Sequence, residues 1–193
     1  MKVSERMSSD VCTLAAHESL ERAAQIMWEH DCGCVPIVDH EQHLVGVITD
    51  RDICMGAYTQ GGCLRDIPVH RCMSRAAHVC APEDSLESAA SRMGSQQVRR
   101  LPVVDGEGHV VGILALGDLA RTIGTARGGP QKQALGGEVA RALSSISEPR
   151  TVRMEAMLPS PDYSIRTRAL ANGESSVPLQ SQSVAPHADE LRM

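Results

Sequence analysis

The chain has 193 residues, a formal net charge of −5 and only 2% aromatic residues, with no phenylalanine. Residues 1–124 carry 11 Lys and Arg against 17 Asp and Glu. This acidic balance opposes binding to a phosphate backbone, and the scarcity of aromatic side chains removes the stacking platforms of single-strand binders. The first eleven residues lack the apolar stretch of a signal peptide, and no run approaches the about 18 apolar residues of a membrane span. We therefore expect a cytoplasmic protein that binds neither nucleic acid nor membrane.

The sequence contains an internal repeat. Residues 19–53 align with residues 85–119 without a gap, and 14 of the 35 aligned positions are identical. The spacing between the copies is too long for a solenoid and fits two compact half-domains. Because neither half is large enough to be stable alone, we expect the two to pack face to face about a pseudo-twofold axis, with the ligand site in the cleft between them.

In the first copy, an extended piece at 10–14 precedes a helix that starts after Ser19, the predicted N-cap. Its apolar residues recur at helical spacing from Leu20 to Met27. Two short runs at 35–39 and 44–48 are rich in β-branched residues and predict a hairpin. A second helix begins at Asp50, where acidic residues occupy the first turn.

The second copy predicts the same order, with an extended piece at 77–80, a helix from Ser85, strands at 101–105 and 110–115, and a helix from 116 to about 123. The sequence thus predicts an α/β (α+β) fold of two β-α-β-β-α repeats, one spanning residues 1–66 and the other 67–124. Residues 125–149 form a linker in which 138–143 could be a short helix. Gly, Pro and Ser are frequent from Thr125 on, so we expect 150–193 to be a largely disordered tail or a segment that folds on a partner.

Several short motifs occur in order and in both copies. They are the Ala-Ala and Met of the first helix, the hydrophobic-Pro-hydrophobic-Val-Asp strand, and the glycine-led strand that ends in Thr-Asp-Arg-Asp in the first copy. From Val3 to Ile123 the chain resembles a pair of cystathionine-β-synthase (CBS) domains, often called a Bateman module. The resemblance implies a homodimer shaped as a flat disc, in which helix faces carrying Met27, Trp28 and Met93 are buried against a second copy.

The resemblance also implies an adenosine-containing ligand, such as AMP, ADP, ATP, S-adenosylmethionine or NAD, and no resident cofactor. In CBS pairs the Gly-hydrophobic-x-Thr-x-x-Asp segment holds such a nucleotide. Asp52 could accept hydrogen bonds from the ribose hydroxyls, while Thr49 and free N–H groups at the helix start would face the phosphate, beside Arg51. The other candidate ligand-binding residues are Thr13, Val35, Pro36, Asp50, Val79, Leu101, Pro102 and Asp118. In the alternative interpretation Thr49 and Asp52 cap the helix.

The second copy departs from this motif. Residues 115–117 (Ala-Leu-Gly) replace residues 49–51 (Thr-Asp-Arg), and only Asp118 is kept. Losing a hydroxyl contact and a charged phosphate contact would cost about two orders of magnitude in affinity. We expect unequal sites, although Arg99 and Arg100 could partly restore a phosphate contact in the second.

Two other functions are open. Seven cysteines and eight histidines without a Cys-x-x-Cys motif could form a soft metal site or a thiol redox switch, with candidates at Cys12, His30, Cys32, Cys34, His78 and Cys80. Small buried hydrophobes are the alternative role for these cysteines. A ligand-free dimeric scaffold is the third hypothesis. No nucleophile-elbow, P-loop or paired-carboxylate motif is present, so we expect a regulatory module, not an enzyme, that acts through an unknown protein partner or its own assembly.

Overall fold

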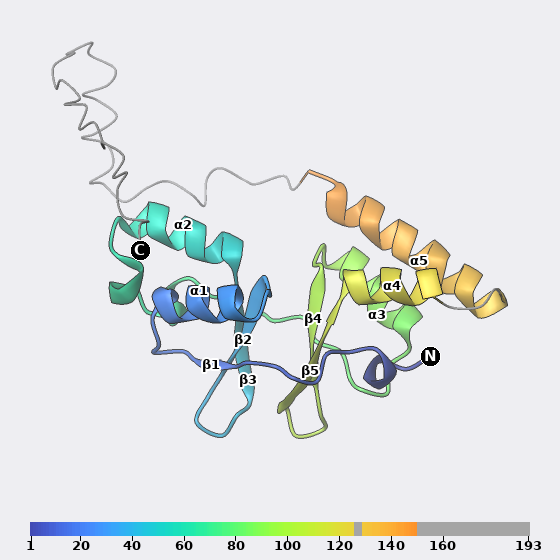
Figure 1. The fold of residues 1–193 in the computed structure, drawn as a ribbon, viewed down its shortest axis with the longest axis horizontal. Coiled ribbons are helices and arrows are strands. Elements are labelled where there is room, and N and C mark those ends of the chain that lie inside the picture. The colour runs from blue at the N-terminus through green and yellow to red at the C-terminus, as the bar shows by residue number, and fades with distance from the viewer. Residues whose placement is uncertain (126–128, 150–193) are drawn as a thin grey trace, which may run out of the picture. The chain divides into compact units, whose positions relative to one another are not determined.

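The computed structural model describes residues 1–125 and 129–149 (Figure 1). The first repeat contains β1 (Leu14–Ala15), α1 (Leu20–Glu29), β2 (Cys34–Val38), β3 (Leu44–Thr49) and α2 (Asp50–Gln60). The second contains α3 (Leu86–Ser95), β4 (Arg100–Val104), β5 (Val110–Ala115) and α4 (Leu116–Thr125), and α5 (Pro130–Ser147) follows. Short 3-10 turns lie at Val3–Glu5, Leu64–Asp66 and Val69–Arg71. The predicted mixed α/β architecture of a repeated pair is confirmed.

One predicted strand is absent from the second repeat. In place of an extended strand at 77–80, Cys80 alone forms a parallel bridge to Val103. Its N–H donates to Pro102 and its carbonyl accepts from Val104. Pro82 follows two residues later and has no N–H to extend the ladder. The corresponding strand in the first repeat, β1, is only two residues long and pairs in parallel with β2.

The two hairpins share one register. Cys34 pairs with Thr49 in the first, and the equivalent residues of the second copy, Arg100 and Ala115, pair in the same way. Each hairpin turn is held by one carboxylate, because Asp39 Oδ1 and Asp105 Oδ1 each accept two backbone N–H bonds at 2.9 Å. The N–H groups of His109 and Glu107 hold the pKa of Asp105 below its ordinary value. Because both turns need this carboxylate, the first strand of each hairpin leads into the same Val-Asp sequence, at Val38-Asp39 and at Val104-Asp105.

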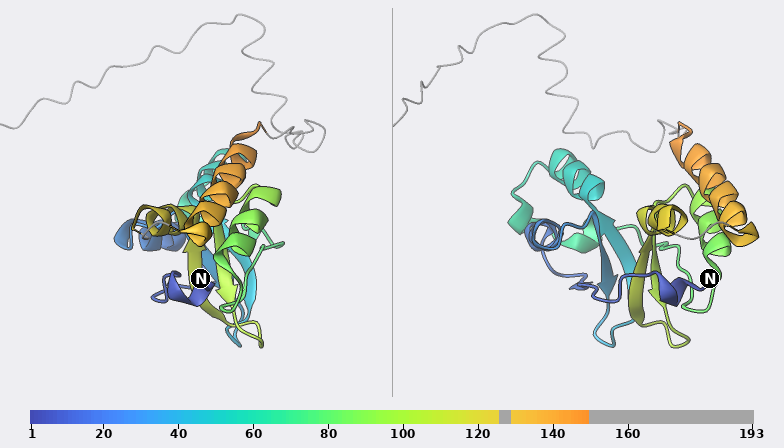
Figure 2. Two further views of the ribbon diagram at one scale, coloured as in Figure 1. Left: turned by 90° about the vertical axis from the view of Figure 1, so that its right-hand side faces the viewer. Right: turned by 45° about the vertical axis from the view of Figure 1, so that its right-hand side comes forward.

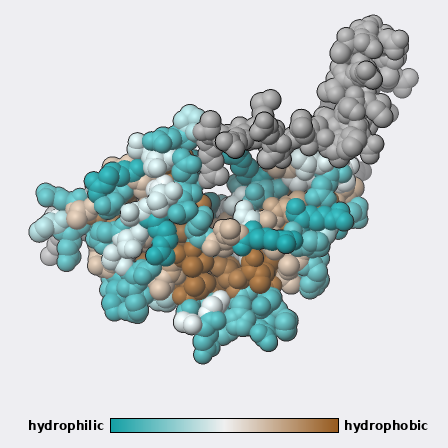
Figure 3. Space-filling view, turned by 180° about the vertical axis from the view of Figure 1, so that it is seen from behind, coloured by the Kyte–Doolittle hydropathy of each residue, from teal (hydrophilic) through white to brown (hydrophobic). Residues whose placement is uncertain are grey.

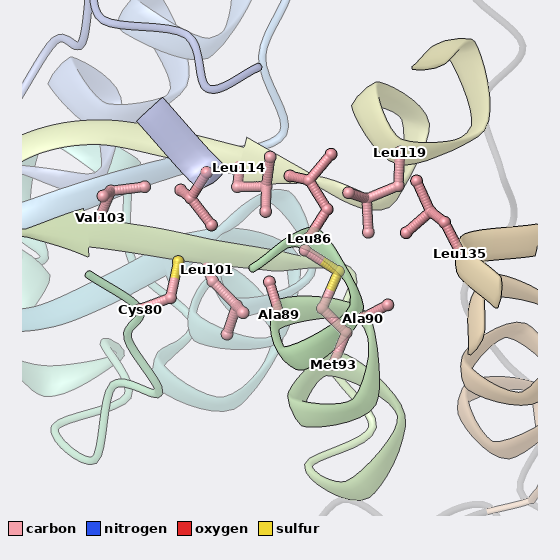
Figure 4. Packing of buried hydrophobic residues seen from close by; sticks show 11 residues of the cluster. Cys80, Leu86, Ala89, Ala90, Met93, Leu101, Val103, Leu114, Leu119 and Leu135 are labelled. Carbon is pink, nitrogen blue, oxygen red and sulfur yellow. The ribbon is translucent and has the colours of Figure 1, made fainter. Parts of the chain in front are cut away.

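Each repeat has its own apolar core, and the chain crosses between them. The first core contains Ile67 and Val69 from the connecting segment, while Val3 from the N-terminus is fully buried in the second core. Figure 4 shows this second core, in which Leu86 and Met93 of α3 face Leu101 of β4 and Leu135 of α5. The segments that sequence order assigns to one repeat thus help to build the other.

Close backbone crossings join these segments to the hairpins. A Cβ on Gly46 would lie 2.9 Å from the Ser74 carbonyl oxygen, and one on Gly112 would lie 3.1 Å from that of Ser8. Ser74 and Ser8 each form antiparallel bridges to the hairpin they cross. Glycine at both positions is therefore required by the approach of a second backbone, not by the turn.

The repeats meet at their hairpin turns. The rings of His43 and His109, which occupy equivalent positions in the two copies, stack with centroids 4.8 Å apart and an interplanar angle of 12°. The Leu44 N–H donates to the Gly108 carbonyl at 3.1 Å. Seen from behind, apolar side chains gather in the middle of the molecule directly above these turns, between hydrophilic flanks (Figure 3). The two hairpins lie side by side about the expected pseudo-twofold axis.

The helix after the second repeat is longer than the predicted 138–143. It runs from Pro130 to Ser147 and packs along α3 and α4 (Figures 1 and 2). Leu135 is 0% exposed and Ala142 is 2% exposed, and Val139 and Ile146 continue the same stripe at helical spacing. The helix therefore belongs to the folded unit, whereas the sequence predicted only a short helix at 138–143.

The prediction about the helix faces was partly wrong. Met27 and Met93, expected to be uncovered, are 8% and 0% exposed. Both point into the core of their own repeat, since they lie on the same helix stripe as Leu20 and Leu86. Trp28, in contrast, is 89% exposed.

No helix within residues 1–125 and 129–149 is long and apolar enough to cross a membrane. The predicted tail, 150–193, lies outside the described residues.

We expect deletion of residues 150–193 to leave the melting temperature nearly unchanged, because the Gly-, Pro- and Ser-rich sequence after Glu148 offers little apolar surface to the core. The measurement is a thermal unfolding scan of the full chain beside the chain ending at Pro149. A drop of more than about 5 °C, or roughly 1–2 kcal/mol for a domain of this size, would contradict it.

Candidate functional site

Thr49 and Asp52 form a reciprocal cap at the point where β3 passes into α2. The Asp52 N–H donates to Thr49 Oγ1 at 3.2 Å, and Asp52 Oδ2 accepts from the Thr49 N–H at 2.9 Å and its hydroxyl at 2.7 Å. This is a capping box, so the capping role weighed for these residues is present. Only Oδ2 is used within the described chain, which leaves Asp52 Oδ1 to accept a hydrogen bond from a ligand.

The first turn of α2 is less open to an anion than the sequence implied. The Arg51 N–H donates to Asp50 Oδ1 at 2.8 Å, and the Asp52 N–H is taken by Thr49. Asp50 and Arg51 are both exposed, so their side chains lie at the surface beside the cap. A phosphate at this helix start would have to displace these caps, whereas the guanidinium of Arg51 is available without rearrangement.

The equivalent carboxylate in the second repeat is already neutralised. Asp118 Oδ2 accepts from the Ala115 N–H at 2.7 Å, and its Oδ1 pairs with the guanidinium of Arg121. Arg121 lies three residues along the same helix, a spacing at which side chains meet. The matching position in the first repeat is Met55, so Asp52 has no such cation. Arg121 lies outside the motif at residues 115–118, so its pairing with Asp118 was not predicted.

Arg100 was expected to contact a phosphate in the second site, but it lies against the first repeat. A Cβ on Gly33 would lie 3.0 Å from Arg100 Nη2. Burial raises the pKa of the adjacent Cys34 thiol to about 11, which the charge of Arg100 only partly opposes and that of Asp50 reinforces. Cys34 is the register partner of Thr49. Arg100 thus places a cation from the second repeat beside the strand pair that leads into α2.

The remaining candidates are buried or half-buried. Val35 and Leu101 are 0% exposed and belong to the two cores, and Pro36 and Pro102 beside them are also buried. Thr13 and Val79 are half-buried. The structure thus brings Thr49, Asp50, Arg51 and Asp52 together at one helix start, with the Val35 and Pro36 strand underneath.

The seven cysteines differ in burial, since Cys34 and Cys80 are buried whereas Cys54 and Cys63 are exposed. Burial raises the pKa of Cys80, like that of Cys34, to about 11, which keeps both protonated near neutral pH. One thiol–imidazole contact exists among the described residues, between Cys12 Sγ and His30 Nε2 at 3.2 Å, and the Cys12 thiol adds to the effect of burial in raising the pKa of Cys32. Within 1–125 and 129–149, no three His, Cys, Asp or Glu side chains are placed to hold a metal ion.

The sequence was compared with known protein families to identify the family of this fold. The CBS domain family matches residues 3–56 and 64–125. The chain belongs to the CBS domain family. Its two CBS domains span residues 3–125, and the predicted resemblance is confirmed.

Three relatives show the range of this family. The CBS domain-containing protein YhcV of Bacillus subtilis is 40% identical over 120 residues, or 61% of this chain and 82% of YhcV. Hypoxic Response Protein I, known from Mycobacterium tuberculosis, has a solved structure with two coordinated zinc ions, 31% identical over 63% of this chain and 98% of that one, with a TM-score of 0.57. The structure of CBSX2 in complex with AMP is 27% identical to this chain and has a TM-score of 0.56. The match covers 63% of this chain and 94% of CBSX2. Enzymes among the relatives match over only about a quarter of their length.

Proposed function

We propose that this chain is a regulatory module that binds an adenosine-containing ligand at the first CBS domain. The observation that supports it best is the carboxylate of Asp52, which has one oxygen unused and no neutralising cation among the described residues, at the start of α2. A carboxylate accepts strong hydrogen bonds from vicinal hydroxyls such as those of ribose. CBSX2, which shares the fold, is known in complex with AMP. The module would signal through a protein partner or its own assembly.

Cations on two sides of this site favour a ligand with a phosphate over a neutral nucleoside. Arg51 lies on the first turn of α2, and Arg100 comes from the second CBS domain against Gly33. Their charges would offset the repulsion between a phosphate and the carboxylates of Asp50 and Asp52. Guanidinium groups also bind phosphate oxygens in pairs, which fixes the orientation of the ligand.

We expect Arg100→Ala to weaken AMP binding about 10-fold and to weaken adenosine binding much less, because only the charged phosphate contact is lost. Arg99→Ala is the matched control, since Arg99 is the exposed neighbour on the chain. Competition titrations with AMP and adenosine on the three proteins measure both ratios. Equal effects of Arg99→Ala and Arg100→Ala would show that general charge, not a contact, is responsible.

A thermal-shift panel tests the proposed function as a whole. AMP, ADP, ATP, S-adenosylmethionine and NAD are added to the full chain, with GMP as the control for the base. A ligand at 100 times its dissociation constant stabilises the folded state by about 2.7 kcal/mol, which is a rise of several degrees here. The proposal expects such a rise with at least one adenine compound, and no shift with any of them at millimolar concentration rejects it.

A metal- or thiol-responsive function is the second candidate, and the contact of Cys12 with His30 favours it. Both are zinc ligands by type, and a solved relative holds zinc ions. The pair needs at least one more ligand, and no third His, Cys, Asp or Glu among the described residues is placed to complete such a site. Zinc added with and without chelator in the same panel should raise the melting temperature of the wild type and not of Cys12→Ser if this function is correct.

A further inference from the structure

Two thiols and an imidazole lie at the corner where α1 leads into β2. Cys12 Sγ lies 3.2 Å from Nε2 of His30, the residue at which α1 ends. Cys32 follows two residues later, and its N–H donates to the Met27 carbonyl at 3.0 Å, which holds it against the last turn of the helix. Cys12 and Cys32 both pack on the apolar core of the first domain. This corner thus combines a thiol in contact with a proton acceptor and a second thiol on the same core.

The strand register explains why Cys12 reaches this corner. β1 runs parallel to β2, with Leu14 opposite Ile37. Cys12 comes two residues before Leu14, and the same register therefore carries it alongside the start of β2, which follows Cys32. Cys12 and Cys32 are half-buried, so a small oxidant in solution reaches both, whereas Cys34 inside the strand is buried. Cys12 and Cys32 are therefore the two thiols of this corner that can react together.

The surroundings of the two thiols suit different steps of an oxidation. The thiolate is the form that attacks an oxidant, and His30 is placed to take the proton of Cys12. Burial raises the pKa of the Cys32 thiol, which the N–H of Cys34 and then the charge of Arg100 only partly oppose. Cys32 therefore stays a thiol near neutral pH and does not attack first. The same N–H and guanidinium stabilise its thiolate when it attacks an oxidised Cys12.

We propose that Cys12 and Cys32 form a reversible disulfide when a hydroperoxide oxidises them, and that this disulfide regulates the nucleotide site of the first CBS domain. The Cys12 thiol gives its proton to His30, and its sulfur attacks the terminal peroxide oxygen. The O–O bond breaks, the alkoxide or hydroxide that leaves takes the proton from His30, and Cys12 becomes a sulfenic acid. Cys32 then attacks the Cys12 sulfur, which forms the S–S bond and releases water. Two thiols are oxidised for each hydroperoxide reduced, and a dithiol reverses the reaction by thiol–disulfide exchange.

The disulfide would lie beside residues that shape the nucleotide site. Gly33 follows Cys32, and a Cβ on it would lie 3.0 Å from Arg100 Nη2. The first residue of β2, one position further on, pairs in register with Thr49 of the α2 cap. A bond between Cys32 and Cys12 holds this loop toward β1, so the guanidinium of Arg100 loses its contact with Gly33. This effect rests on the proposed function, because it requires a ligand phosphate at Arg100.

Peptide mapping of the full chain tests the disulfide without any nucleotide. The chain is treated with one equivalent of hydrogen peroxide in the presence of a chelator, which excludes metal binding, and free thiols are then alkylated. The tryptic peptides 7–22, with Cys12, and 23–51, with Cys32 and Cys34, should be linked, and dithiothreitol should separate them. His30→Gln should slow the formation of the link about 10-fold or more, because the proton acceptor is lost.

Matched variants assign the link to one pair of thiols. Cys32→Ser should abolish it, whereas Cys34→Ala, two residues away on the same peptide, should retain it. Cys54→Ser, which removes an exposed thiol on α2, is the second control and should also retain it. No link in the wild type, a link that survives Cys32→Ser, or an unchanged rate with His30→Gln would each overturn the proposal.

Titration of the reduced and the oxidised chain with AMP and adenosine tests the regulation. Oxidation should weaken AMP binding about 10-fold and adenosine binding much less, because only the phosphate contact of Arg100 is lost. In Cys32→Ser the same peroxide treatment should change neither affinity. Equal affinities of the reduced and oxidised wild type would overturn the regulatory role. No AMP binding by the reduced chain would reject the proposed function, and the regulatory role with it, while the peptide map still decides the disulfide.

Discussion

Replacing Leu135 by alanine should lower the stability of the folded unit by about 2–5 kcal/mol. Leu135 is 0% exposed and lies where α5 closes the second core, against Leu119 and the α3 side chains (Figure 4). The substitution removes three buried carbons and leaves a cavity that the flanking helices fill only in part. Chemical denaturation with circular dichroism measures the change.

Leu143→Ala provides the control on the same helix, because Leu143 is 52% exposed and its loss should change stability by less than about 0.5 kcal/mol. The two variants have the same change in helix propensity, so their difference reports burial alone. Equal stabilities would mean that α5 does not pack on the second domain in solution.

Asp52→Ala should weaken binding of an adenosine nucleotide by about 1.5–3 kcal/mol, or roughly 10- to 150-fold. The equivalent change Asp118→Ala should have much less effect on affinity. The reason is visible in the contacts: Asp52 has an unused carboxylate oxygen, whereas both oxygens of Asp118 are taken by Ala115 and Arg121. Isothermal titration on the wild type and the two variants measures the losses, and equal losses would show that the two sites are equivalent.

A cap-preserving variant separates ligand binding from folding. Asp52→Asn keeps an oxygen for the Thr49 N–H but loses the charge, so its stability should remain close to that of the wild type. Removing the cap altogether costs about 1 kcal/mol, far less than would unfold the domain. A fall in affinity for both Asp52 variants at nearly constant stability would assign the effect to the ligand contact.

The local elements were predictable because their signals lie within a few residues. Ser19 caps α1 through the N–H of Arg22, as the sequence predicted, and Ser85 caps α3 in the same way through the N–H of Ser88. The hairpins follow from short apolar runs rich in β-branched residues and from one Asp that holds each turn. The internal repeat predicted the pairing of the two domains, since equivalent sequences adopt equivalent folds.

The contacts that distinguish the two domains were not predictable in this way. Arg100 meets Gly33, and Val3 enters the second core, through contacts between residues far apart in the sequence. The full length of α5 was missed, because its glycines at 136 and 137 break the pattern that burial of Leu135 and Ala142 makes evident. Arg121 could have been found from its spacing to Asp118.

A crystal structure of the full chain grown with AMP tests the nucleotide site most directly. The account predicts AMP at the start of α2, with ribose hydroxyls within hydrogen-bond distance of the Asp52 carboxylate and the phosphate near Arg51 and Arg100. It also predicts that Asp118 keeps its pairing with Arg121. AMP bound at Asp118 alone, or no AMP at millimolar concentration, would contradict the account.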